Sequence, residues 1–396
     1  MRKNALLVLL LVALLAFPTG SVFAQELPAP FCGQLSEADC DILVMSQEAQ
    51  LDATSYTSSV DATTTIVGIP GLPAEELVFS WVQDTVIHMD PEIMRRMVEL
   101  QTQGAEAMME NFEELMELTV ELYRTLGVDV MINFTMPAEI ADTLAMQSGV
   151  DVPEELDFHV ILKDGFGYIS TEGLEFIDPS LPEMADWIGI DLAGMVEMGV
   201  AQSTASQDPA QREAMMQSMA FSSMFSSDEV RDLLEDFVLV ERLDDDEVGG
   251  TEVAVFETGF DFAGFLASPG FWTLVEENLD TINAMSDTDL TAQELQQARM
   301  AITFLGPALL QGLQLSSTAS IGLDNYYPYA QMVDFSWDLS DLLSFAATTG
   351  ALPPGSPTRA LISLEIDATS ADFDNAPEIE APEDALVIPL EAMGVQ

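Results

Sequence analysis

Residues 333–339 have the sequence VDFSWDL, and this alternation of apolar and polar side chains is the pattern that decides the fold. In an extended strand successive side chains point to opposite faces, so Val333, Phe335 and Trp337 share one face and the residues between them share the other. The sequence therefore predicts a sheet with one apolar and one polar face. Comparable alternation recurs in the segments 56–66, 77–81, 156–163 and 360–367.

Short connections between these segments indicate how the strands pair. Asp164 and Gly165 are the residue types of a two-residue hairpin turn, and they follow the strand at 156–163. Because short connections join antiparallel neighbours, we expect an antiparallel sheet. Further hairpins are expected between 237–243 and 251–259 and between 315–323 and 333–339.

Helical segments interrupt the predicted sheet, and long insertions stand near 91–126 and 208–231. The first of them starts with Asp90 and Pro91, which suit a helix cap and the first helical position. The mixture predicts an α+β fold, with residues 25–396 as one domain and a division into two lobes as the alternative. Capping boxes mark two more helix starts, at Ser36–Asp39 and Thr291–Glu294.

The first two dozen residues have the features of a cleavable secretory signal. Arg2 and Lys3 precede an apolar stretch at 5–17, Pro18 ends it, and small residues lead to Ala24, after which we expect cleavage. The apolar stretch is shorter than the about 20 residues that span a bilayer, so no stable transmembrane anchor is expected. The mature protein is predicted to be secreted or to reside in the cell envelope.

Cys32 and Cys40 are the only cysteines. In an exported chain an even pair favours a disulfide, which would join the entry loop to the first turn of the helix that begins near Glu37. Zinc binding by the two thiols is the alternative to a disulfide, but two thiols without a nearby histidine make an incomplete zinc site. Lipid attachment to Cys32 is not expected, because Pro30 and Phe31 stand where a lipidation signal has small residues.

The chain is strongly acidic, with 68 acidic and 11 basic residues and a formal net charge of −57. Such a surface repels phosphate backbones, which excludes nucleic acid as a partner. Solubility, or life in a salty or acidic medium, is the simplest explanation of the charge. A hydrophobic content of 48% is enough to fill a core, so the chain is not predicted to be disordered.

The sequence contains no recognisable catalytic motif. His88 and His159 both fall inside strand patterns, where a solvent-facing histidine is favoured over a general base. The acidic run 244–247 lacks the spacing of a calcium loop, because Val255 occupies the twelfth position from Asp244. The sequence contains no G-x-S-x-G nucleophile elbow, no H-E-x-x-H zinc-binding helix, no Walker loop and no glycine pattern of a dinucleotide-binding fold. We expect no catalytic, metal or cofactor site.

Several short motifs stand in an order that resembles a family of exported bacterial proteins. They are the strand at 56–67, Gly165–Ile169, Trp187–Leu192, Val248–Phe256, Asp324–Pro328 and Asp374–Ala385. On these residues the chain is similar to the LolA-like lipoprotein-carrier superfamily, especially its LppX and LprG group, over about half of its length. The resemblance implies a curved antiparallel sheet, a half-barrel, that wraps around helices and leaves an apolar cavity for acyl chains.

The chain departs from that family in two respects. The lipid-bearing cysteine of many members is missing, and the helical insertions near 91–126 and 208–231 enlarge the chain. The insertions would fill the cavity, cover it as a lid, or form a second lobe.

Strand pattern and resemblance together predict a non-enzymatic, extracytoplasmic protein that buries a hydrophobic small molecule or lipid. The 22 methionines suit a surface that repacks around apolar ligands, although ordinary core filling explains them as well. One alternative is an envelope interaction or sensor protein that binds a polypeptide partner, and a less favoured one is a carboxylate-dependent secreted hydrolase. The predicted ligand lining is Phe79, Trp81, Met108, Phe112, Met116, Phe335 and Trp337.

Overall fold

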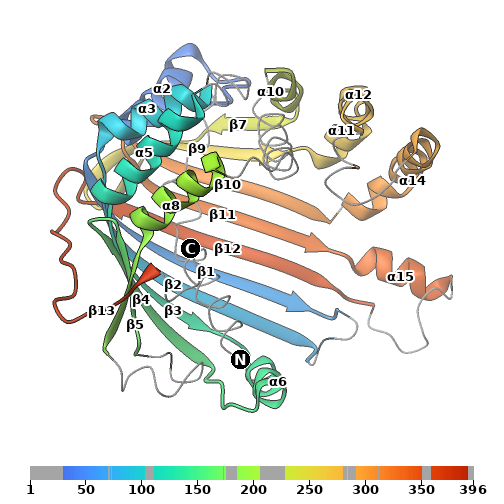
Figure 1. The fold of residues 1–396 in the computed structure, drawn as a ribbon. Helices are drawn as coiled ribbons and strands as arrows, with labels where there is room; N and C mark the ends of the chain where they lie inside the picture. The colour runs from blue at the N-terminus through green and yellow to red at the C-terminus, as the bar shows by residue number, and fades with distance from the viewer. Residues whose placement is uncertain are drawn as a thin grey trace.

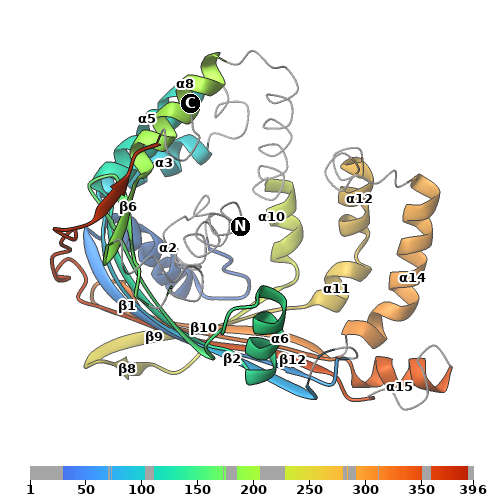
Figure 2. The same ribbon diagram turned by 60° about the horizontal axis from the view of Figure 1, so that its bottom comes forward.

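The computed structural model describes residues 30–69, 72, 74–102, 111–172, 174, 185–205, 228–279, 283, 291–310, 312–349 and 358–390. The predicted signal segment, Met108 and most of the 208–231 insertion lie outside these residues. Within them, one sheet of 13 strands curls around helices without closing on itself (Figures 1 and 2). The predicted α+β half-barrel is confirmed.

The sheet extends in both directions from β1 (Ser55–Val67), which pairs antiparallel with β2 (Glu76–His88) and β12 (Leu361–Ala371). Only the terminal pair of β13 with β6 is parallel among the described strands, so the predicted antiparallel sheet is confirmed. Beyond β2 lie β3 (Gly127–Thr135), β4 (Glu155–Lys163), β5 (Phe166–Ser170), β6 (Trp187–Asp191) and β13 (Leu386–Ile388). Beyond β12 lie β11 (Pro328–Asp338), β10 (Leu313–Gly322), β9 (Thr251–Phe260) and β7 (Val238–Arg242), with β8 (Asp246–Val248) also on β9.

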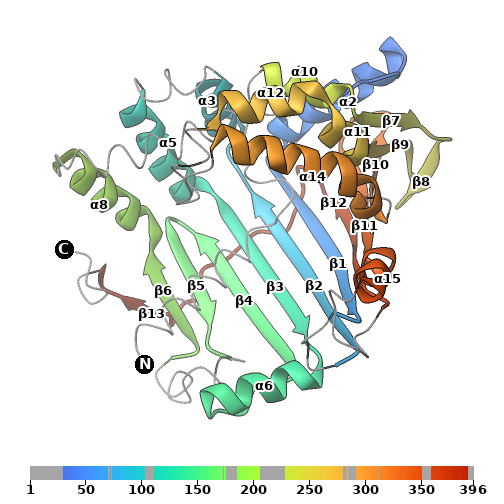
Figure 3. The same cartoon turned by 90° about the vertical axis from the view of Figure 1, so that its right-hand side faces the viewer.

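The helices lie on the concave side of the sheet and along its rim (Figure 2). Figure 3 shows α3, α5 and α8 at one end of strands β3–β6 and α6 at the other. No helix in the described ranges is long and apolar enough to cross a membrane. The helices are α2 (Glu37–Asp52), α3 (Pro91–Thr102), α5 (Phe112–Thr125), α6 (Ala138–Ser148), α8 (Leu192–Ala205), α10 (Asp228–Glu235), α11 (Phe262–Ala267), α12 (Pro269–Glu277), α14 (Ala292–Leu310) and α15 (Ser340–Thr348).

The largest core cluster joins α3 and α5 to the sheet. Leu118 and Leu122 of α5 are buried together with Ile87 of β2 and Val130 of β3. The sequence predicts one long helix over 91–126, and the structure corrects this to two helices that pack on each other. A single straight helix would place its two halves out of contact, whereas a pair buries the apolar stripes of both halves against the sheet.

The predicted helix starts and the first hairpin are confirmed in atomic detail. Oδ1 of Asp90 accepts a hydrogen bond from the backbone N–H of Glu92 at 2.9 Å. The hydroxyls of Ser36 and Thr291 accept from the backbone N–H groups three residues on, and at Thr291 the Glu294 carboxylate completes the capping box by accepting from the backbone N–H of Thr291. Asp164 and Gly165 have φ angles of 53° and 86°, which a tight two-residue turn between antiparallel strands requires.

The second predicted hairpin, between 237–243 and 251–259, needs a correction at its tip. The acidic run is expected to be a plain solvated tip, but residues 246–248 form the short strand β8, which turns onto β9 through Gly249 and Gly250. Both glycines have positive φ and form the tight turn after the run, so Asp246 and Glu247 lie in a strand and not in the tip. The side chains of 244–247 are nevertheless exposed.

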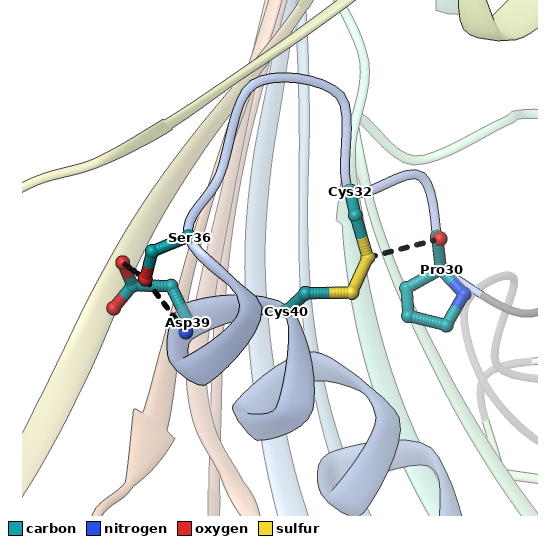
Figure 4. Close-up of a disulfide and its surroundings, with 5 residues drawn as sticks. All are labelled: Pro30, Cys32, Ser36, Asp39 and Cys40. Carbon is teal, nitrogen blue, oxygen red and sulfur yellow. Dashed lines mark hydrogen bonds between the residues drawn. A yellow bond between two sulfur atoms is a disulfide. The ribbon is translucent and has the colours of Figure 1, made fainter.

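Cys32 and Cys40 form the predicted disulfide, with their Cα atoms 5.3 Å apart (Figure 4). The bridge joins the chain just before α2 to the first turn of that helix, beside the Ser36 cap. Ile42 and Leu43 of α2 then pack against buried Phe256 of β9. The disulfide therefore secures the segment that places α2 on the sheet.

Three segments, around Thr54, Tyr327 and Asp374, meet at one corner of the sheet. The ring of Tyr327 stacks on Phe373 with centroids 4.2 Å apart, and its hydroxyl donates to Asp374 Oδ2 at 2.7 Å. Asp374 Oδ1 accepts from the backbone N–H and the hydroxyl of Thr54 at 2.7 and 2.9 Å. Burial alone would raise the pKa of Asp374, but these hydrogen bonds outweigh it and lower the pKa. Burial and the bonded Asp374 carboxylate raise the pKa of Tyr327 to about 12.

After β12 the chain crosses the convex side of the sheet toward β13 (Figure 1). His88 Nε2 donates to the carbonyl oxygen of Pro377 at 2.7 Å, and Ile379 is buried against Ile161 and Tyr168. The C-terminal segment thus covers apolar side chains that the convex side would otherwise expose.

Candidate ligand-binding face

The side of the sheet on which Tyr56 and Ile87 pack against α3 and α5 is called the inner face, and the opposite side is the outer face. The register places four predicted lining residues on the inner face in three adjacent rows. Phe79 is aligned through Thr64 and Leu364 with Phe335, three strand spacings or about 14 Å away. Trp337 and Trp81 lie on the rows to either side: Trp337 is aligned through Ile362 and Ile66 with Leu77, and Trp81 through Ala62 and Ile366 with Val333.

No inner-face residue is charged at the paired positions of β1–β4 and β10–β12. The apolar residues at these positions are Leu77, Phe79, Trp81, Ile87, Tyr56, Val60, Ala62, Ile66, Ile362, Leu364, Ile366, Ala368, Val333, Phe335, Trp337, Leu313, Leu315, Ala319, Ile321, Val128, Val130, Ile132, Phe134, Leu156, Phe158, Val160 and Leu162. The remaining positions are Pro328 and residues of serine, threonine or glutamine.

The outer face carries the charge. Asp61 stands directly opposite Asp367, and Asp334 directly opposite Glu365, across neighbouring strands. Like charges at directly paired positions oppose strand pairing, so these acidic side chains do not stabilise the sheet. The sheet therefore separates an acidic surface from an uncharged one. Further outer-face acids are Asp84, Asp129 and Asp157.

The predicted lining residues differ in how far other elements cover them. Phe79 stacks on Phe134, 6.4 Å away, in a cluster with α6, so part of its ring is already packed. Trp81, Phe335 and Trp337 are half-buried. Met116 is half-buried on α5, two residues before the buried Leu118. Phe112 begins α5, and Met108 and the side chain of Phe112 lie outside what the structure describes.

Sequence reasoning missed a short polar band that crosses the inner face. Gln83 and Thr85 on β2 are 6% and 3% exposed, and Gln83 Nε2 donates to Thr85 Oγ1 at 3.0 Å. Ser58 on β1 pairs with both Thr85 and Ser370 on β12, so the band spans three strands. The signal was present, because these polar residues interrupt an otherwise apolar alternation.

At the sheet edge, charged residues occupy inner-face positions: Arg242 of β7, and Glu252 of β9 with its partner Glu247 of β8. Arg242 of β7 is paired with Phe256 and lies over its ring at 5.0 Å. Its guanidinium forms ion pairs with Asp39 of α2, at 3.5 Å from Nε, and with Asp245. Arg242 therefore has its partners within the protein and ties α2 to the edge strand.

The histidines occupy structural positions. His159 lies on the outer face, where its Nε2 is 2.7 Å from Asp129 Oδ1 and its ring meets the edge of Trp187. His88 holds the C-terminal segment, as described above. Among the residues that the structure covers, no group of three or more metal-ligating side chains comes together.

No family model and no curated protein match the chain. Among solved structures it is similar to lipoprotein LppX of Mycobacterium tuberculosis, at 8% identity over 87% of this chain and 100% of LppX, with a TM-score of 0.30. LprF of Mycobacterium bovis matches at 11% identity over 88% of this chain and 98% of LprF, also with a TM-score of 0.30. A DUF1329 family protein of Desulfovibrio piger matches at 7% identity over 87% and 94%, with a TM-score of 0.18.

LppX is a protein of the group that the sequence resemblance names. At these identities and TM-scores no statement about the ligand rests on the likeness.

Proposed function

We propose that the protein is an extracytoplasmic binder of a hydrophobic ligand, which lies against the inner face between the rows of Trp81 and Trp337. The observation that carries this proposal is the separation of charge between the two faces. A chain with a net charge of −57 keeps charged residues off the inner-face positions of its central strands, and leaves Phe335 and both tryptophans half-buried there.

The energy available on such a surface suits a hydrocarbon chain. Each buried methylene group contributes about 0.8 kcal/mol, so about ten of them contribute about 8 kcal/mol. That corresponds to a dissociation constant of about 1 μM before the entropic costs of binding. No charged contact and no chemical step is needed. The Cys32–Cys40 disulfide supports a location outside the cytoplasm, where disulfides persist.

The test compares the two faces of one strand. Phe335→Ala removes an aromatic ring from the inner face, whereas Met332→Ala removes a side chain that is 47% exposed on the outer face of the same strand. Binding of the uncharged fluorescent probe N-phenyl-1-naphthylamine is titrated in both variants and in the parent protein. We expect Phe335→Ala to weaken binding by about tenfold, because part of an aromatic contact is lost.

Met332→Ala should bind the probe as the parent does. Equal affinities in all three proteins would contradict the proposal, as would parent protein that takes up no probe. Solvent extraction of the purified protein followed by mass spectrometry provides a second measurement, in which a bound lipid is the expected result.

A further inference from the structure

The polar band of the inner face has hydrogen-bonding capacity that the protein itself does not use. Gln83 donates one hydrogen bond to Thr85, and no other hydrogen bond of these two side chains occurs within the described part of the chain. The carbonyl oxygen of Gln83 and the hydroxyl proton of Thr85 are therefore left as an acceptor and a donor. In the described residues the fully buried side-chain atoms without a hydrogen-bond partner do not include the Gln83 oxygen, so this acceptor is not sealed inside the protein.

The polar band lies directly beside the apolar rows of the inner face. Gln83 is the next inner-face residue after Trp81 along β2, and Thr85 is next to Ile87, which α3 and α5 cover. The band thus lies between the helix-covered end of the inner face and the apolar surface assigned above to the ligand chain. Ser58 and Ser370 extend it across β1 and β12.

The charge around the band decides which head group fits. None of the inner-face positions on β1–β4 and β10–β12 offers a cation for an anionic head or a carboxylate for a cationic one. Arg242 already pairs with Asp39 and Asp245. A charged group buried without a partner is penalised by several kcal/mol, whereas an uncharged hydroxyl, ester or amide needs only hydrogen bonds.

We infer that the ligand is an uncharged amphiphile, with a head group that both donates and accepts hydrogen bonds, held by Gln83 and Thr85 while its chain lies toward Trp81 and Phe335. The inference rests on the proposed function and adds the class of ligand to it. Ionised fatty acids and alkylamines of the same chain length are selected against.

The experiment measures displacement of bound N-phenyl-1-naphthylamine by monooleoylglycerol, oleate and oleylamine, at a pH where oleate and oleylamine are both charged. In the parent protein, monooleoylglycerol should displace the probe at a concentration about tenfold lower than either charged lipid, which is the ratio that about one hydrogen bond confers. Gln83→Leu and Thr85→Val keep the side-chain shape but remove the polar groups. Each should lose most of the preference while its affinity for the probe is retained.

Gln314→Leu is the matched control, because Gln314 is exposed on the outer face of β10 and its replacement should leave the preference unchanged. Circular dichroism establishes that each variant is folded. Equal displacement by oleate and monooleoylglycerol, or a preference that survives both band substitutions, would overturn the inference while probe binding still supports the proposed function. Failure of the parent to bind the probe would overturn both.

Discussion

Removing one of two facing aspartates on the outer face should make the protein more stable. Asp61 and Asp367 occupy directly paired positions of β1 and β12, where side chains lie about 5 Å apart. Two unit charges at that distance in water repel each other by about 0.8 kcal/mol. Asp61→Asn or Asp367→Asn should each relieve this repulsion, and the double variant should gain no further stability from this pair.

The coupling is measured by a double-mutant cycle, with free energies of unfolding taken from urea titrations at low ionic strength. In 1 M salt, where the Debye length is about 3 Å, the coupling should fall to about a fifth of its low-salt value. Asp61 with Glu257 of β9 serves as the control pair, because four strand spacings, or about 19 Å, separate them. Additive single substitutions at low salt, or a coupling that 1 M salt leaves unchanged, would refute the reasoning.

Three further predictions concern stability. Replacing both cysteines of the disulfide with serine should lower the free energy of unfolding by about 2.5 kcal/mol, from the loop closed by a sequence separation of 8, as urea titration would show. The raised pKa of Tyr327 means that the folded state favours the neutral phenol, so the parent should lose stability as pH rises from 10.0 to about 12. Tyr327→Phe, which lacks the hydrogen bond to Asp374, should lose less stability in that interval, and burial of Tyr123 and Tyr168, which also raises their pKa values, accounts for the remaining loss. Gly68→Ala should destabilise by more than Gly149→Ala in thermal unfolding, because both have positive φ but only at Gly68 would the new methyl meet a backbone carbonyl, that of Arg359.

Local sequence patterns predict much of the strand and helix content, because their causes are local. Asp164–Gly165 specifies its own turn, and Ser36 specifies its own helix start. β3 was missed although Val128, Val130 and Ile132 alternate clearly, because a helix expected to reach residue 126 left the segment without a visible turn before it. The strand is instead entered directly after α5 ends at Thr125.

The site was predicted only in part for a different reason. Alternation places Phe335 and Trp337 on one side of their strand, but it does not say which strand lies beside them. The register that aligns Phe335 with Phe79 passes through β1 and β12, whose segments stand at opposite ends of the sequence. Gln83 and Thr85 were missed because the predicted strand ended at Trp81, whereas β2 continues to His88.

The position of β12 between β1 and β11 has a consequence for how the molecule is made. Strands β1–β6 and strands β7–β11 are joined in the sheet through this one strand, which follows all of them in the chain. As the nascent polypeptide emerges, each of its two half-sheets exposes an unpaired edge strand and an apolar face. Both stay exposed until residues 361–371 are synthesised and pair with β1 and β11. Long-range pairing of this kind is slow, so the newly made chain is open to self-association during that interval.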